Sequence, residues 1–166
     1  MKAEVLAALE ARRPTIRANW ESLLRLEKVT SPLANPDTLV HLIDRTLDEL
    51  FADLRLWSVR RHPTRAPAPD CPCGRNPHLA YFAAGRQALR EGLIMVETEA
   101  VPLEPVDRDL CVACLDQAYS HIERREIEAF CAVCQLRPAA AASRWRWVPD
   151  KAGVMRRVAA HASHHD

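Results

Sequence analysis

Six cysteines arranged as three close pairs are the residues of this sequence with the clearest capacity for chemistry. The pairs are Cys71 with Cys73, Cys111 with Cys114, and Cys131 with Cys134. Thiolates at such spacings are the usual ligands of zinc and of iron–sulfur clusters. On spacing alone, the run Cys111-x2-Cys114-x16-Cys131-x2-Cys134 fits a four-cysteine zinc site.

A geometric argument disfavours that contiguous pattern. Neither Gly nor Pro occurs from Val106 to Leu136, and the apolar spacing predicts one long helix there, with a single kink as the alternative. At a rise of 1.5 Å per residue, Cys111 and Cys131 would lie about 30 Å apart, which one tetrahedral ion cannot bridge. The pattern survives only if the helix breaks sharply between residues 119 and 125.

A different quartet needs no such break. Asn76-Pro77 is a helix-start signature, and the helix that it opens is predicted to run to about Glu99. The next helix must return antiparallel, so its residues near 129 come back beside the start of the first. This arrangement predicts one structural zinc ion per chain. Its ligands would be Cys71, Cys73, Cys131 and Cys134.

Several alternatives stay open for these cysteines. An iron–sulfur centre uses the same four ligands. Cys111 and Cys114 fit a buried core position or a reversible dithiol better than they fit a metal site. His78 is the one histidine near the proposed site and is a minor candidate ligand. Disulfide exchange is disfavoured, since no β/α pattern surrounds a Cys-x-x-Cys.

The composition indicates the fold that must position these residues. The 166-residue chain has 48% hydrophobic and 27% charged residues but only four glycines, and helix formers dominate. We expect an all-α fold, with four or five helices in a bundle or in globin-like packing. Residues 1–142 form one domain that includes a Pro-rich connector at 58–76. Residues 143–166 are a tail that is disordered or holds a short helix over 153–162.

The individual helices follow from apolar periodicity and from prolines. We expect a short helix before Pro14, a second from Pro14, an amphipathic one from Pro36 to near Trp57, and the long pair at 77–99 and 106–136. The last two form an antiparallel hairpin, with the metal site at its open end.

Net charge and targeting signals predict the partners and the cellular location of the protein. The net charge of +1 argues against nucleic acid as the main partner, although Arg144 and Arg146 stand beside tryptophans. The sequence shows no signal peptide and no membrane-spanning run, which predicts a cytoplasmic protein with reduced thiols. We expect an unidentified protein partner, no membrane partner, and an oligomeric state open to a homodimer.

No catalytic motif is present. The sequence has no Ser-His-Asp order, phosphate-binding glycine loop or His-Glu-x-x-His helix. A zinc ion with four sulfur ligands has no open position for water, so it would pin structure rather than catalyse hydrolysis. These observations predict that the protein is not an enzyme.

The N-terminal part resembles a known bacterial family. The similar stretches are Arg13-Pro14 through Trp20, Leu23-Leu24, residues 30–37 and Leu47-Asp48-Glu49-Leu50. They resemble the N-terminal helical domain of RsbR/RsbRD-type co-antagonists of bacterial stress signalling. The resemblance implies a globin-like sensory domain without haem, over about the first hundred residues. This chain lacks the length for the effector domain of such regulators, and cysteine pairs do not define the family.

Together these observations predict a zinc-binding helical regulatory, sensor or interaction module. The alternatives are a thiol-based metal or redox sensor and an iron–sulfur electron-transfer protein.

Overall fold

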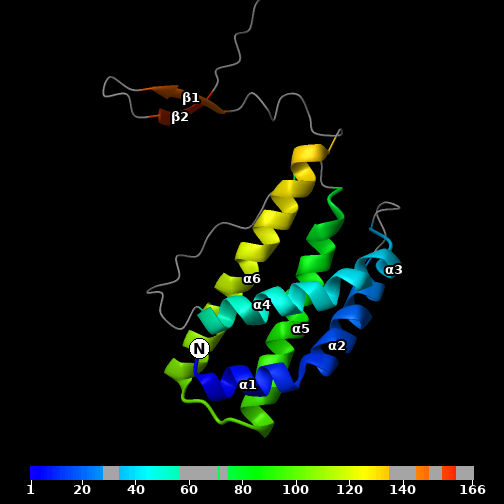
Figure 1. Cartoon of the computed structure of the whole chain (residues 1–166), viewed down its shortest axis with the longest axis vertical. Coiled ribbons are helices and arrows are strands. Elements are labelled where there is room, and N and C mark those ends of the chain that lie inside the picture. The colour runs from blue at the N-terminus through cyan, green and yellow to red at the C-terminus, as the bar shows by residue number, and fades with distance from the viewer. Residues whose placement is uncertain (28–33, 57–70, 72–74, 135–144, 150–154, 160–166) are drawn as a thin grey trace, which may run out of the picture.

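The computed structural model describes residues 1–27, 34–56, 71, 75–134, 145–149 and 155–159. Up to Cys134, the described residues are helical or irregular, with five helices of nine residues or more. The predicted all-α architecture is therefore confirmed for this part of the chain. Figure 1 shows two long helices running side by side, with the shorter helices packed across them.

The first two helices are separated where the sequence predicted. Helix α1 spans Ala3–Ala11 and α2 spans Arg13–Leu26, with Pro14 in the first turn of α2. Proline fits there because the first helical N–H groups have no partner inside the helix. The buried side chains recur at helical spacing, so each helix turns one face into the core. These residues are Val5, Leu9, Ile16, Trp20 and Leu24.

The third predicted helix is divided. Helix α3 spans Pro36–Leu39, a 3-10 turn η2 spans Val40–Leu42, and α4 spans Ile43–Leu56. Asn35 caps α3 as predicted, since its side chain accepts a hydrogen bond from the Asp37 N–H. After the tight turn, the Thr46 hydroxyl donates to the Leu42 carbonyl at 3.0 Å, a contact that commonly bends a helix.

The two long helices form the predicted antiparallel hairpin. Helix α5 spans Pro77–Glu99 and α6 spans Pro105–Val133. At one end Arg108 donates to Glu97 at 2.7 Å, and at the other Asn76 donates to the Ile127 carbonyl at 3.2 Å. Helix α6 starts at Pro105, one residue earlier than expected, because proline occupies its first position instead of preceding it.

In the first half of α5, the helices α2 and α6 both come into close contact with its backbone. The Trp20 indole N–H donates to the Tyr81 carbonyl, and the Tyr119 hydroxyl donates to the Phe82 carbonyl, both at 3.0 Å. A Cβ atom on Gly85 would overlap the Trp20 ring and the Tyr119 hydroxyl. Glycine therefore permits α2 and α6 to reach the backbone of α5 from two sides.

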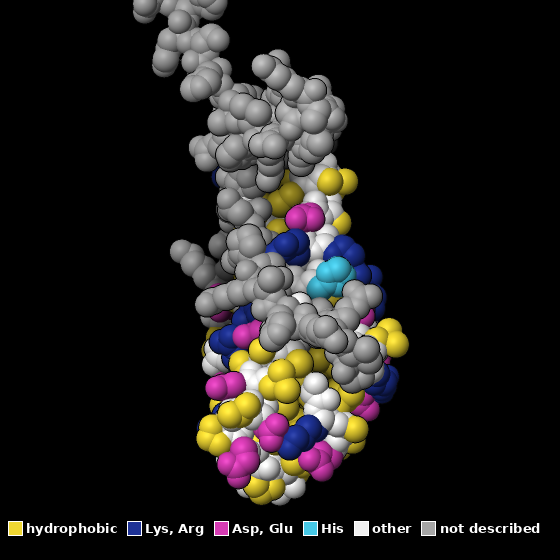
Figure 2. Space-filling view, turned by 90° about the vertical axis from the view of Figure 1, so that its left-hand side faces the viewer, with side chains coloured by type: hydrophobic (Ala, Val, Ile, Leu, Met, Phe, Trp, Pro, Cys, Tyr) yellow, Lys and Arg dark blue, Asp and Glu magenta, His cyan; other side chains and the backbone are white. Residues whose placement is uncertain are grey.

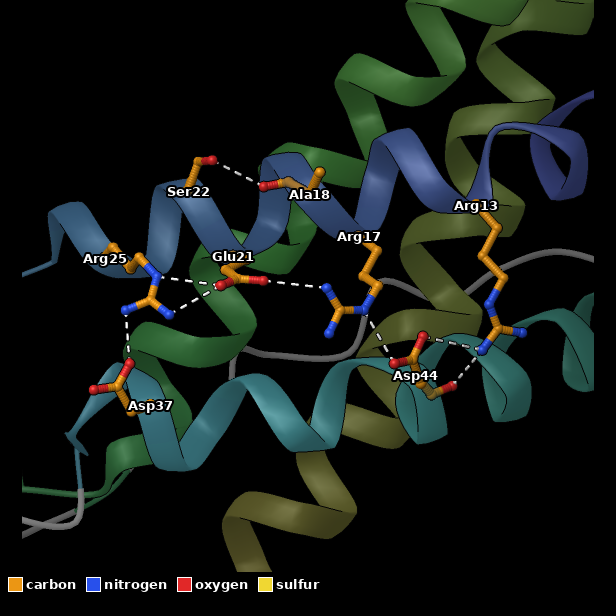
Figure 3. Close-up of polar contacts among 8 residues, drawn as sticks. All are labelled: Arg13, Arg17, Ala18, Glu21, Ser22, Arg25, Asp37 and Asp44. Atoms are coloured by element: carbon orange, nitrogen blue, oxygen red, sulfur yellow. Dashed lines mark hydrogen bonds and ion pairs between the residues drawn. The ribbon is translucent and has the colours of Figure 1, made fainter.

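A row of charged residues joins α2 to α3 and α4 (Figure 3). Arg13 and Arg17 both bond Asp44, and Arg25 bonds Asp37 at 2.7 Å. Glu21 lies between Arg17 and Arg25 on α2 and pairs with both. Because these side chains are largely exposed, the row aligns the helices more than it stabilises the fold.

The C-terminal part corrects one prediction. Strands β1 (Trp145–Pro149) and β2 (Met155–Ala159) pair antiparallel, with Trp147 opposite Arg157. The short helix expected within 153–162 is therefore wrong for residues 155–159, where the chain forms β2. Trp145-Arg146-Trp147-Val148 alternates in type with the period of a strand, and its aromatic and β-branched residues favour strands. The order of the remaining tail residues lies outside the described part.

The described helices carry a mixed surface. Acidic, basic and hydrophobic side chains are interspersed on the face shown in Figure 2. No helix among the described residues is long and apolar enough to cross a membrane.

Candidate metal centre

The course of α6 decides between the two cysteine quartets. Cys111 and Cys131 lie on one continuous helix, Pro105–Val133. The rise of an α-helix puts their backbones about 30 Å apart. Bonds of about 2.3 Å from sulfur to zinc cannot span that separation. A single ion shared by Cys111, Cys114, Cys131 and Cys134 is therefore excluded.

At the open end of the hairpin, Asn76 lies beside Cys131, one of the predicted ligands. Asn76 is 4% exposed, and its side-chain oxygen accepts the His78 N–H at 2.9 Å, which caps α5. Its side-chain N–H₂ group donates to the Ile127 carbonyl and, at 3.5 Å, to the Cys131 sulfur. The Asn76 side chain thus joins the start of α5 to the last turns of α6, and one of its partners is the predicted ligand Cys131.

The structure describes three of the four predicted ligands. Cys71 is 7% exposed and precedes α5, and Cys131 is partly buried against the core. Cys134 is the half-buried C-terminal cap of α6. Cys73 lies outside the described residues. Among those described, no three His, Cys, Asp or Glu side chains form a group that could hold a metal ion.

Hydrogen-bond donors lie beside Cys131 at this end of the hairpin. The N-terminus of α5 carries a partial positive charge, because its first N–H groups lack partners within the helix. The Asn76 amide brings a further N–H to the sulfur. Such donors are typical of the shell around metal-bound cysteine.

His78 stands beside this end but faces the core. Its ring lies 5.8 Å from the Phe130 ring and near those of Tyr81 and Phe82. Burial lowers the pKa of His78, the Glu126 carboxylate raises it, and Arg45 lowers it. Its Nδ1 is buried and has no hydrogen-bond partner in the described part of the chain. The neutral imidazole is therefore the favoured form in the folded protein.

The third cysteine pair occupies the opposite end of α6. Cys111 is 1% exposed and belongs to the hydrophobic core, as its spacing predicted. Burial raises the pKa of its thiol. Cys114 is partly buried, and its sulfur lies 3.6 Å from the Met1 amino nitrogen. These two thiols are separated from the proposed centre by most of the length of α6.

Two structural features were missed from the sequence. Burial raises the pKa of Glu123, an effect opposed by its ion pair with Arg86, which also stacks over the Tyr119 ring. The hydrogen bonds from Asn76 to Ile127 and Cys131 of α6 were also not predicted, although the role of Asn76 as the cap of α5 was. The signal for the cap is local, whereas the bridge depends on how two distant helices align.

Protein-family models, curated proteins and solved structures give no match with this chain. The resemblance to RsbR-type sensory domains stays a prediction. The case for function rests on the geometry of the molecule.

Proposed function

We propose that this protein is a helical module that binds one zinc ion through Cys71, Cys73, Cys131 and Cys134. The observation that carries the proposal is the contact of Asn76 with the Cys131 sulfur. It joins the N-cap of α5 to Cys131, a member of the other cysteine pair near the end of α6. Cys71 and Cys73 come only a few residues before Asn76 along the chain.

The chemistry of the four thiols supports zinc. Cys131 and Cys134 are three residues apart, a spacing that puts two helical side chains on one face. Gly74 follows the first pair and gives the backbone freedom to wrap around an ion. Metal sites commonly complete themselves only when the ion binds, because the ligands repel one another as bare thiolates. The absence of a gathered group among the described residues is compatible with such a site.

A closed four-sulfur site favours a regulatory or interaction role. Zinc with four protein ligands retains no water to activate, so it clamps segments together. Here it would fasten the segment before α5 to the end of α6 and so control the shape of this surface. A module of this kind serves a protein partner, and we do not assign it an enzymatic activity.

The first test combines elemental analysis with alkylation. The three cysteine pairs fall in three different tryptic peptides, residues 66–75, 109–124 and 126–144. We expect about one zinc per chain and, on chelation, faster iodoacetamide labelling of peptides 66–75 and 126–144. Labelling of peptide 109–124 should be unaffected. An absorption spectrum of the purified protein distinguishes zinc from an iron–sulfur centre.

Single substitutions supply the matched control. Cys131→Ser and Cys71→Ser should each remove stoichiometric zinc, whereas Cys114→Ser, on the same helix, should retain it. Zinc that survives in Cys131→Ser but is lost in Cys114→Ser would overturn the assignment.

A further inference from the structure

Cys111 and Cys114 lie on one face near the start of α6. Helix geometry puts their Cα atoms about 5 Å apart, within the range that a disulfide spans. Asp107 lies one turn before Cys111 on the same face. This face is independent of the proposed zinc centre, because the two lie at opposite ends of α6.

Met1 and Lys2, which lie just before α1, contact this pair of thiols. The Met1 amino nitrogen lies 3.6 Å from the Cys114 sulfur. The Lys2 backbone lies at the Cys111 sulfur, where it opposes the rise in the thiol pKa that burial causes. The Lys2 side chain also donates to Asp107 at 2.8 Å. Met1 and Lys2 therefore contact α6 at the two thiols and at Asp107 beside them.

We propose that Cys111 and Cys114 are a redox-active dithiol, and that its oxidation by a hydroperoxide to an intrahelical disulfide releases Met1 and Lys2 from α6 and so loosens the N-terminal end of α1.

The two cysteines have different roles in this reaction. Cys114 is partly exposed, so its sulfur meets the peroxide and attacks one oxygen. The O–O bond breaks, Cys114 becomes a sulfenic acid, and water leaves with the thiol's proton. The buried Cys111 sulfur then attacks the Cys114 sulfur, the S–O bond breaks, and a second water leaves with the Cys111 proton. Hydrogen peroxide is reduced to two waters, and two thiols are oxidised to one disulfide.

Helix geometry explains why oxidation would disturb α1. Side chains three residues apart in a regular helix have Cβ atoms about 5–6 Å apart, whereas a disulfide needs about 3.5–4.5 Å. Helix α6 must tighten locally around residues 111–114 to close the bond. The sulfurs then turn toward each other and away from Lys2 and Met1. The same strain makes the disulfide easy to reduce, which suits a reversible switch.

The test treats the zinc-loaded full-length protein with hydrogen peroxide, then alkylates and digests it with trypsin. We expect peptide 109–124 to lose two hydrogens and to regain both on reduction with dithiothreitol. Hydrogen exchange of residues 3–11 should accelerate roughly tenfold in the oxidised protein and recover after reduction. Peptide 109–124 that keeps both thiols while the other two peptides oxidise would overturn the proposal, and so would a disulfide without faster exchange.

Two variants keep the test specific. Cys114→Ser should form no disulfide, and peroxide should leave exchange in residues 3–11 unchanged. Cys111→Ser should stop at a sulfenic acid on Cys114 that dimedone traps. If peroxide loosens α1 equally in Cys114→Ser, the dithiol is not the cause and the proposal fails.

Discussion

The two ends of the α5–α6 hairpin are held by different means. At the closed end the contact between Glu97 and Arg108 joins residues 11 apart, whereas the contact between Asn76 and Ile127 joins residues 51 apart. Closing the longer loop costs about 1.4 kcal/mol more in chain entropy. The open end therefore depends more on specific contacts than the closed end does. A metal clip stabilises most where the closed loop is longest.

The largest loss of stability is expected at Gly85, where α2 and α6 pack against α5. Gly85→Ala puts a methyl group into the Trp20 ring and the Tyr119 hydroxyl. We expect a loss of about 2 kcal/mol of unfolding free energy, because overpacking outweighs the gain in helix propensity. Urea denaturation measures this loss, and hydrogen exchange should rise at both ends of the hairpin.

Gly92→Ala is the matched control within the same helix. Its added Cβ would lie 2.7 Å from the Ile16 Cγ1, and only one side chain has to shift. We expect a clearly smaller loss than for Gly85→Ala. Equal losses of unfolding free energy would mean that the close contact of Trp20 and Tyr119 with Gly85 is not the cause of the loss in Gly85→Ala.

The second prediction separates the ends by using the two Asn-Pro helix starts. Asn35→Ala removes a cap and should cost about 1 kcal/mol, whereas Asn76→Ala also removes the bonds to α6 and should cost about 2 kcal/mol. Denaturant midpoints of the two variants give the difference. Only Asn76→Ala should speed hydrogen exchange over residues 127–134. Equal costs would show that the bridge to α6 contributes nothing.

The smallest effect is a pH dependence confined to the open end. The pKa of His78 is lowered from 6.5 in the folded protein, so below pH 6.5 the unfolded chain binds more protons than the folded chain. Unfolding free energy should therefore fall as the pH drops from 6.5 through the folded-state pKa. In chelator-treated protein, His78→Gln should flatten this slope between pH 7.5 and 5. An unchanged slope would assign the dependence to other groups.

The sequence predicted the helices well where local signals mark their ends. Asn76-Pro77 gave the start of α5, and the run without Gly or Pro gave α6 to within one residue at its start and three at its end. The lengths of the two helices gave their pairing. The β1–β2 hairpin was missed because no turn signal of the two-residue type separates its strands. The 3-10 turn at Val40–Leu42 could not be predicted, because it contains no proline or glycine.

The candidate site was predictable only in part. Cysteine spacing and helix rise together reject the contiguous pattern and bring Cys131 to the start of α5. The hydrogen bond from Asn76 to the Cys131 sulfur could not be predicted, since it depends on the rotation of each helix about its axis. The packing of Trp20 and Tyr119 against Gly85 of α5 sets that rotation. A glycine in the sequence does not indicate which side chains pack against it.

The order of charges along α2, with Glu21 between Arg17 and Arg25, restricts how that helix can slide along α4. Arg17 lies against Asp44, and Glu21 follows one turn later along the same face. If α2 moved by one turn along α4, Glu21 would meet Asp44 and two carboxylates would face each other. Such a slip would also separate Arg25 from Asp37. Although each exposed pair contributes little energy, the order of signs leaves one favourable alignment of the two helices.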